Sequence, residues 1–138
     1  MADMAFDSLS VGDELTPLTT APINRTTLAL YAGASGDHNP IHIDLDFAKA
    51  AGMPDVFAHG MLSMAYLARL LTNWMPQSKL RSFSNRFVAI TNLQDKITCR
   101  GKVVELLSQD GEELVRLEIE AVNDAGEVKL AGEALVAV

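Results

Sequence analysis

Residues 35–44 read Ser-Gly-Asp-His-Asn-Pro-Ile-His-Ile-Asp and place an acid, two histidines and an amide around one proline. Proline lacks a backbone donor and interrupts regular helix, so we expect an ordered loop that presents these polar side chains. Asp37 and His42 are chemically different groups that can share one water molecule, remove a proton from it and return a proton elsewhere. The pattern therefore favours acid–base chemistry, with hydration as the reaction type.

Each of these side chains also has a purely structural interpretation. Asp37 could cap a turn, and His42 could be a hydrogen-bonded histidine of the core. Their presence together in one proline-containing loop favours the catalytic interpretation for both. His38 is expected to point away from its neighbours and to be exposed.

A second polar group stands in the sequence Ala58-His59-Gly60, directly before the apolar run 61–74. At the start of a helix, Gly60 would expose backbone N–H groups at the positive end of the helix dipole. Without a side chain it would also allow a ligand carbonyl to approach closely. Gly60 is thus a candidate oxyanion hole, or alternatively a glycine that begins a helix without any ligand. We expect His59 to hold the loop by hydrogen bonding.

A metal site is the first alternative to consider. Asp37, His38, His42 and His59 are all competent ligands, but Pro40 disrupts the helical spacing between the first two histidines. The sequence contains no cysteine cluster and no His-Glu-x-x-His pattern, so we predict no metal.

Covalent catalysis is the second alternative. Cys99 lies in a predicted strand among ordinary residues, and Ser35 and Ser63 lack a motif that would expose and activate a nucleophile. We therefore expect no covalent intermediate.

The first part of the chain predicts three helices that surround the loop. Asn24 can cap a helix over 25–34, with Gly33 and Gly36 at its end, and Asp44 can cap a short helix through residue 51. The run 60–74 is apolar around most of the helical circumference, so we expect a buried helix.

The second part changes to the alternating pattern of antiparallel strands with one covered face. We expect strands over 80–89, 97–107, 114–122 and 128–138, with turns at 109–111 and 123–126 and a short edge strand near 15–18. The order of elements predicts an α+β domain in which a sheet wraps one long helix.

The composition fits one domain over residues 1–138, because 49% hydrophobic residues suffice for a core without staples. A single cysteine, no signal-like start, and an apolar run interrupted by Arg69 and Asn73 predict a cytoplasmic protein without a membrane span. A net charge of −7 disfavours nucleic acid and anionic membranes as partners.

The same negative charge means that an anionic carrier group would have to be held by a few local cations. Lys79, Arg81 and Arg86 are the candidates, although each could equally be an ordinary solvated charge on a strand.

Residues 31–44 (from Tyr31 to Asp44), Ala48, and 58–61 resemble the signature of MaoC-like dehydratases, the family that contains (R)-specific enoyl-CoA hydratases. They are also similar to the catalytic subunit of hydroxyacyl-carrier-protein dehydratases. The resemblance implies a hot-dog fold, in which a curved antiparallel sheet wraps one central helix, and a dimer of identical or homologous subunits.

The resemblance also implies roles for particular residues. Asp37 and His42 match the catalytic pair, and Gly60 matches the backbone donor to the thioester oxygen. We expect Asn39, His59 and Met61 to order the loop or to contact the substrate.

The implied activity is the reversible hydration of trans-2-enoyl thioesters to (R)-3-hydroxyacyl thioesters. No cofactor is expected beyond the CoA or carrier protein that bears the acyl group. A thioesterase on the same fold, or one subunit of a heterodimeric dehydratase, remains an alternative. Acyl length, carrier, pathway and the identity of the base are left open.

Overall fold

The computed structural model describes residues 6–138. Its helices and strands, in chain order, are β1 (Leu18–Thr19), α1 (Arg25–Ser35), α2 (Leu45–Ala50), α3 (Gly60–Trp74), β2 (Leu80–Phe87), β3 (Thr98–Gln109), β4 (Glu112–Val122) and β5 (Val128–Ala137). Single turns of 3-10 helix are η1 (Phe6–Ser8), η2 (Pro40–His42) and η3 (Gln77–Lys79).

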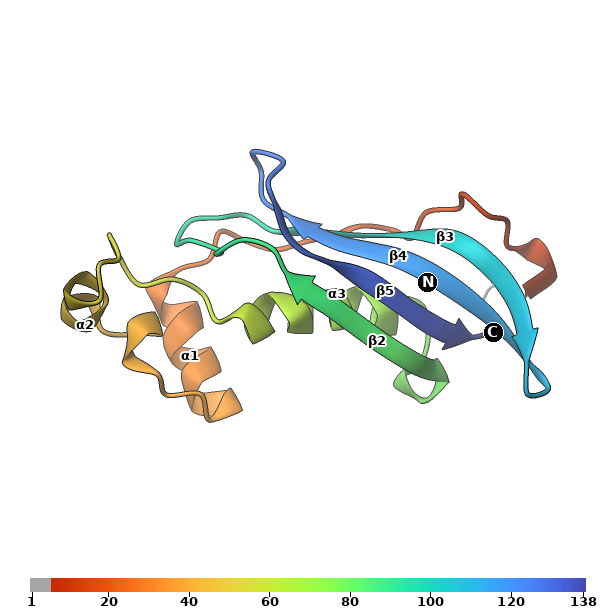
Figure 1. Ribbon diagram of the computed structural model, residues 1–138, viewed down its shortest axis with the longest axis horizontal. Coiled ribbons are helices and arrows are strands. Elements are labelled where there is room, and N and C mark those ends of the chain that lie inside the picture. The colour runs from red at the N-terminus through yellow and green to blue at the C-terminus, as the bar shows by residue number, and fades with distance from the viewer. Residues whose placement is uncertain (1–5) are drawn as a thin grey trace.

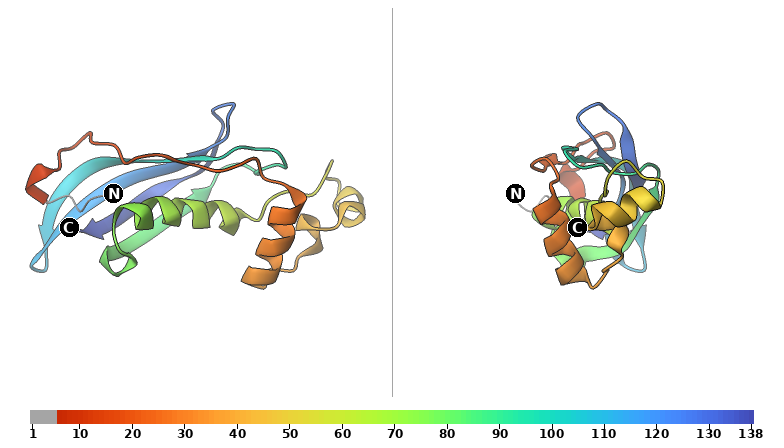
Figure 2. Two further views of the ribbon diagram at one scale, coloured as in Figure 1. Left: turned by 180° about the vertical axis from the view of Figure 1, so that it is seen from behind. Right: turned by 90° about the vertical axis from the view of Figure 1, so that its left-hand side faces the viewer.

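Within residues 6–138 the strands form one five-stranded antiparallel sheet in the order β1-β3-β4-β5-β2. The sheet curves over α3, while α1, α2 and η2 gather beyond the first turn of that helix (Figure 1). Figure 2 shows the same arrangement from behind and along the long axis. The α+β architecture expected from the sequence is confirmed.

Alternation along the strands decides which face of the sheet meets the helix. On β4, Val115, Leu117 and Ile119 are buried, whereas Arg116 and Glu118 point outward. Side chains alternate between faces in a strand, so one apolar face results and packs on α3. The four long strands are confirmed, with ends that differ by up to two residues, and the short edge strand expected near 15–18 lies at 18–19.

The caps expected from the sequence explain where the short helices begin and end. The Asn24 side chain accepts a hydrogen bond from the Thr27 N–H, and the Asp44 side chain accepts from the N–H groups of Asp46 and Phe47. Gly36 ends α1 in the left-handed conformation, with φ of 78°. Gly33, by contrast, lies inside the helix and does not mark its end.

The expectation that α3 is buried on nearly all sides is wrong for the single chain. Leu67, Leu70 and Trp74 are buried, but Met61 is 53% exposed and Ala65 and Arg69 are exposed as well. These three residues follow one another at intervals of four, so they form a stripe along the helix that the sheet does not cover. Helical periodicity shows that a face is apolar and does not show what covers it.

No helix within residues 6–138 is both long and apolar enough to cross a membrane.

Gly132 on β5 provides a test of how tightly β2 is packed on its neighbour. A methyl group there would overlap the carbonyl oxygen of Ser84 and would lie 2.7 Å from the Cα of Asn85. We expect Gly132→Ala to lower the free energy of unfolding by roughly 1–3 kcal/mol or more, as overpacking does. Chemical denaturation measures this change.

Gly33→Ala is the matched control, because nothing lies within 4 Å of the added methyl group. In α1 it should raise the free energy of unfolding by up to about 1 kcal/mol. Equal stability of Gly132→Ala and the wild type would contradict the close packing of β2 on β5.

Candidate active site

The loop between α1 and α2 is ordered by its own side chains. The Asp37 N–H donates to the Ser35 hydroxyl oxygen (3.2 Å), and the Asn39 N–H donates to the Asp37 carboxylate (3.2 Å). The Asn39 side chain in turn accepts from the Ile41 N–H (3.1 Å). Pro40 then opens the single turn η2, where a missing backbone donor costs nothing. The expectation that Asn39 orders the loop is confirmed, and His38 is exposed as expected.

His42 stands at the end of η2 with 9% of its surface exposed. Its Nδ1 lies 2.7 Å from the carbonyl oxygen of Phe57. A carbonyl can only accept, so Nδ1 carries a proton and donates it. In the neutral ring Nε2 therefore holds the lone pair, which is the arrangement that a proton acceptor requires.

His59, the last residue before α3, ties this segment back to the loop. It is 1% exposed, and its Nε2–H donates to the backbone carbonyl of Asp37 (3.2 Å). Its ring stacks on that of His42, with centroids 3.9 Å apart and an angle of 27° between the planes. The edge of Tyr31 contacts it from another side at 4.8 Å. The expectation that His59 holds the loop by hydrogen bonding is confirmed.

Burial sets the charge state of His59. Loss of solvent is the largest effect and lowers the pKa of its ring. The hydrogen bond to the Asp37 carbonyl raises this pKa by less, the neighbouring His42 lowers it, and the Asp37 carboxylate has the smallest, raising effect. Its Nδ1 has no hydrogen-bond partner within residues 6–138. A neutral ring suits a position stacked against a second histidine, because two imidazolium cations would repel each other.

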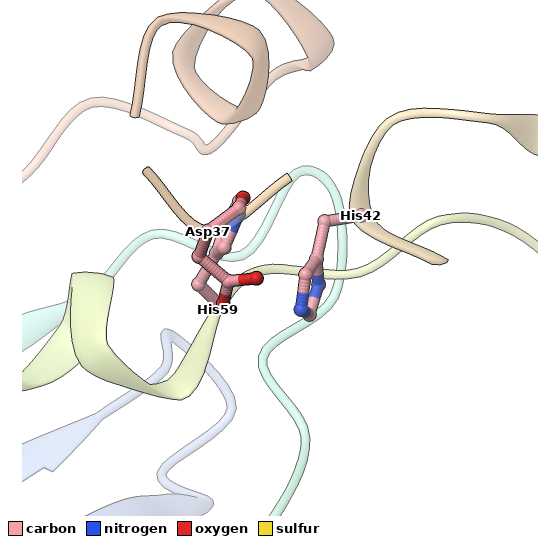
Figure 3. Close-up of side chains that lie close together, drawn as sticks. All are labelled: Asp37, His42 and His59. Atoms are coloured by element: carbon pink, nitrogen blue, oxygen red, sulfur yellow. The ribbon is translucent and has the colours of Figure 1, made fainter. Parts of the chain in front are cut away.

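The fold brings Asp37, His42 and His59 together, with one potential ligand atom of each within 4.8 Å of the others (Figure 3). Asp37 is exposed, whereas both histidines are buried. Metal ligation requires lone pairs that converge on one point, and the nearly parallel rings of His42 and His59 direct theirs poorly for that purpose. Water shared between the carboxylate and one imidazole fits this arrangement better. The absence of a metal stays a prediction.

Gly60 is the first residue of α3, and no side chain caps the N–H groups of the first turn. Such groups lack partners within the helix, so they can receive an anionic or carbonyl oxygen. The ring of Phe87 also lies 2.8 Å from the position that a Cβ of Gly60 would occupy. A side chain at this position would have to displace the Phe87 ring, which is 56% exposed at the end of β2.

A cavity of about 270 Å³ opens beside Gly60. It is lined by Phe57, Ala58, Gly60, Phe87, Val88, Ala89, Ile90, Thr91 and Leu130. Its mostly apolar lining fits an acyl group. A larger hollow of about 810 Å³ has many charged side chains in its lining, among them Arg86, one of the candidate carrier-binding cations. None of Asp37, His42, His59 and Gly60 lines it, so we place the site at the smaller cavity.

The structure also locates the remaining candidates. Met61 is exposed beside Gly60 and does not line the cavity. Burial raises the pKa of the Cys99 thiol to about 12, and the Ser63 hydroxyl faces that of Thr91 at 3.3 Å, so neither side chain is activated as a nucleophile. Arg81 pairs with Glu112, at the surface.

Sequence reasoning missed the roles of Phe57 and Phe87. Phe57 acts through its backbone oxygen, a group that every residue possesses, so no residue type could identify it. Phe87 lies in the strand predicted over 80–89, and nothing in the sequence distinguishes it from the other apolar residues there. Tyr31 belongs to the recognised motif, but its contact with His59 depends on the fold.

The lowered pKa of His59 predicts a pH-dependent stability. The unfolded ring takes up a proton near pH 6.5 and the folded ring only at lower pH, so His59 contributes stability that is fully present above pH 6.5. That contribution is lost as the pH falls from 6.5 through the folded pKa. We expect His59→Gln to remove this part of the decline in the free energy of unfolding, measured by denaturation between about pH 7.5 and 5.

The exposed His38 provides the control, since His38→Gln should leave the pH profile of stability unchanged. Parallel profiles for the wild type and His59→Gln would show that His59 titrates like a solvated histidine.

Comparison with known proteins places this geometry in a family. The family model described as "MaoC like domain" matches residues 8–125. Among curated proteins, the fatty acid synthase subunit beta of Saccharomyces cerevisiae is 33% identical over 133 residues, which cover 91% of this chain and 6% of that protein. The (R)-specific enoyl-CoA hydratase of Rhodospirillum rubrum is 28% identical, over 96% of this chain and 90% of its own length. The chain thus corresponds to a small part of the synthase subunit and to nearly all of the hydratase.

Solved structures show the same architecture. The R-hydratase PhaJ1 from Pseudomonas aeruginosa superposes with a TM-score of 0.85 and 29% identity, covering 98% of this chain and 86% of its own. The (R)-hydratase from A. caviae involved in PHA biosynthesis gives a TM-score of 0.81 and 26% identity, covering 94% and 96%. The curled sheet around α3 is the hot-dog fold. With most of its length matched by the family model, the chain belongs to the MaoC-like family.

Proposed function

We propose that this protein adds water reversibly to trans-2-enoyl thioesters and forms (R)-3-hydroxyacyl thioesters. The observation that carries the proposal is the meeting of the exposed Asp37 carboxylate and the buried His42 imidazole beside the first turn of α3. The names of the matched hydratases agree with this chemistry. The CoA or carrier-protein group would serve as part of the substrate, and no further cofactor takes part.

In the proposed hydration, Asp37 and His42 hold one water molecule between them. The water oxygen forms a bond to C3 while the electron pair of the double bond shifts toward the thioester, giving an enolate. One of the pair takes a proton from the water, and the pair returns a proton to C2, so that the addition is complete and Asp37 and His42 regain their starting protonation. Dehydration follows the same steps in reverse.

Gly60 supplies the electrostatic part of this mechanism. Its N–H, at the positive end of α3, would donate to the thioester oxygen as negative charge develops there. Because the carbonyl and the water are both fixed, attack reaches C3 from one face only and yields one enantiomer.

We further propose that the active form is a dimer of two copies or of this chain with a homologous subunit. Strand β2 is an edge of the sheet and has a free backbone side. Phe87, Val88 and Ile90 at its end are 56%, 55% and 45% exposed beside the cavity. A second subunit at this edge would pair the strand and cover the apolar side chains.

Removing either member of the acid–base pair tests the proposed function. We expect Asp37→Asn and His42→Ala to reduce turnover roughly 10²- to 10⁴-fold with the fold retained, because general acid–base groups contribute about this much. Loss of enoyl absorbance from crotonyl-CoA measures the rate, and a dehydrogenase specific for each enantiomer identifies the product.

The exposed His38 again gives a control, since His38→Ala should retain full turnover. A folded Asp37→Asn or His42→Ala with wild-type rates would remove the pair from the mechanism. Formation of the (S) product, or release of free CoA, would reject the proposed reaction.

The close contact of Phe87 allows the role of Gly60 to be separated from packing. Gly60→Ala alone is expected to abolish turnover for either reason, since its methyl group meets both the ring and the substrate carbonyl. Gly60→Ala combined with Phe87→Ala removes the collision with the ring. We expect the double variant to regain stability and to stay at least about 10²-fold slower than Phe87→Ala, because the thioester oxygen is still displaced.

Thermal denaturation and the crotonyl-CoA assay measure the two quantities separately. Full recovery of turnover in the double variant would show that Gly60 serves only the packing of Phe87.

A further inference from the structure

Lys129, at the start of β5, is a buried cation that the proposed reaction does not use. Only 1% of the residue is exposed, which is rare for lysine unless its charge is paired. Its ammonium group donates to the Ile90 carbonyl at 2.7 Å and forms an ion pair with Glu127. The carboxylate of Asp95 lies 3.5 Å away.

The side chain and the backbone carbonyl of Lys129 both bind one segment, residues 88–92, which we call the wall segment. The Lys129 carbonyl accepts hydrogen bonds from the N–H groups of Val88 (2.8 Å) and Ala89 (3.3 Å), while the side chain holds Ile90. Asp95 fixes the far end of the segment, because its carboxylate accepts from the Asn92 N–H at 2.8 Å. Four residues of this segment, Val88 to Thr91, line the cavity beside Gly60.

The wall segment contacts the backbone of residues 57 and 58, which precede Gly60 and include the carbonyl that binds His42. The Thr91 carbonyl accepts from the Ala58 N–H (2.9 Å), directly before His59 and Gly60. Asn92 forms an antiparallel bridge with Phe57. Phe57 is the residue whose carbonyl receives the Nδ1–H of His42. A continuous path of backbone contacts therefore runs from Lys129 through the wall segment to the His42 imidazole and to the start of α3.

We propose that Lys129 is a positioning residue for the active site. Its buried ammonium group, paired with Asp95 and with the more exposed Glu127, holds the wall segment in one place. The segment sets the Phe57 carbonyl and the Gly60 N–H relative to the substrate. Charged hydrogen bonds are strong and directional where water is excluded. Lys129 touches no reacting atom and acts only through the residues it holds. The proposal rests on the proposed hydratase function for its kinetic consequences.

Lys129→Met tests the proposal, because it keeps the length of the side chain and removes the ammonium donor. The matched control is Val136→Ala, a buried change at the opposite end of β5. Activity is expressed per folded protein, with the folded fraction taken from denaturation curves. We expect Lys129→Met to lower kcat on the order of 10- to 100-fold, as a small misplacement of catalytic groups does. KM should change by a smaller factor than kcat, because Phe87 and Leu130 line the cavity from outside the wall segment.

Hydrogen–deuterium exchange supplies a measure that does not depend on catalysis. Lys129→Met should speed exchange in peptides that contain residues 57–60 and 88–92, and Val136→Ala should leave these peptides at the wild-type rate. Asp95→Asn, which retains an acceptor for the Asn92 N–H, should produce the same changes to a smaller degree. If Lys129→Met does not fold, the exchange and the kcat of Asp95→Asn test the proposal in its place.

Wild-type kcat in folded Lys129→Met, or unchanged exchange over residues 57–60, would overturn the proposal. An equal fall of kcat in Val136→Ala would also overturn it, since the loss would then reflect general destabilisation. If the wild type does not hydrate enoyl thioesters, the proposed function fails, and the exchange data alone still decide whether Lys129 positions this segment.

Discussion

The hydrogen bonds that join the loop after α1 to the segment before α3 run in opposite directions. His42 of the loop donates to the Phe57 carbonyl of the segment, and His59 of the segment donates to the Asp37 carbonyl of the loop. The His42 and His59 rings are also stacked, so each hydrogen bond helps to fix the ring that makes the other bond. The position of the carboxylate, the tautomer of His42 and the orientation of the first turn of α3 all depend on this crossed pair.

Burial changes the pKa values of two side chains in the site. Burial lowers the pKa of the His59 ring, which disfavours a positive charge on the ring that stacks against His42. Burial also raises the pKa of Tyr31, and the Asp37 carboxylate adds to that effect, so the phenol stays protonated. Within residues 6–138, Asp37 supplies the one carboxyl group of this cluster, and it is exposed while both histidines are buried.

Close packing and the proposed chemistry both favour a residue without a side chain at position 60. The ring of Phe87 occupies the space of a side chain, and the uncapped N–H groups of α3 need an open approach. Met61 and Ala65 are exposed on one side of α3, and Phe87, Val88 and Ile90 are exposed at the end of β2, which is an edge strand. In the proposed dimer, the second subunit would cover these apolar side chains and pair with the edge of β2.

The sequence by itself determined the elements and the motif. Caps at Asn24 and Asp44, the turn at Gly36 and the alternation along β4 depend on residues a few positions apart, and local patterns of this kind are legible in one chain. Only the tertiary structure decided what each polar group meets. The bonds of His42 to Phe57, His59 to Asp37 and Lys129 to Ile90 join residues 15, 22 and 39 positions apart. All three end on backbone carbonyls, which are the same in every residue, so the approach of distant segments, and no residue type, selects them.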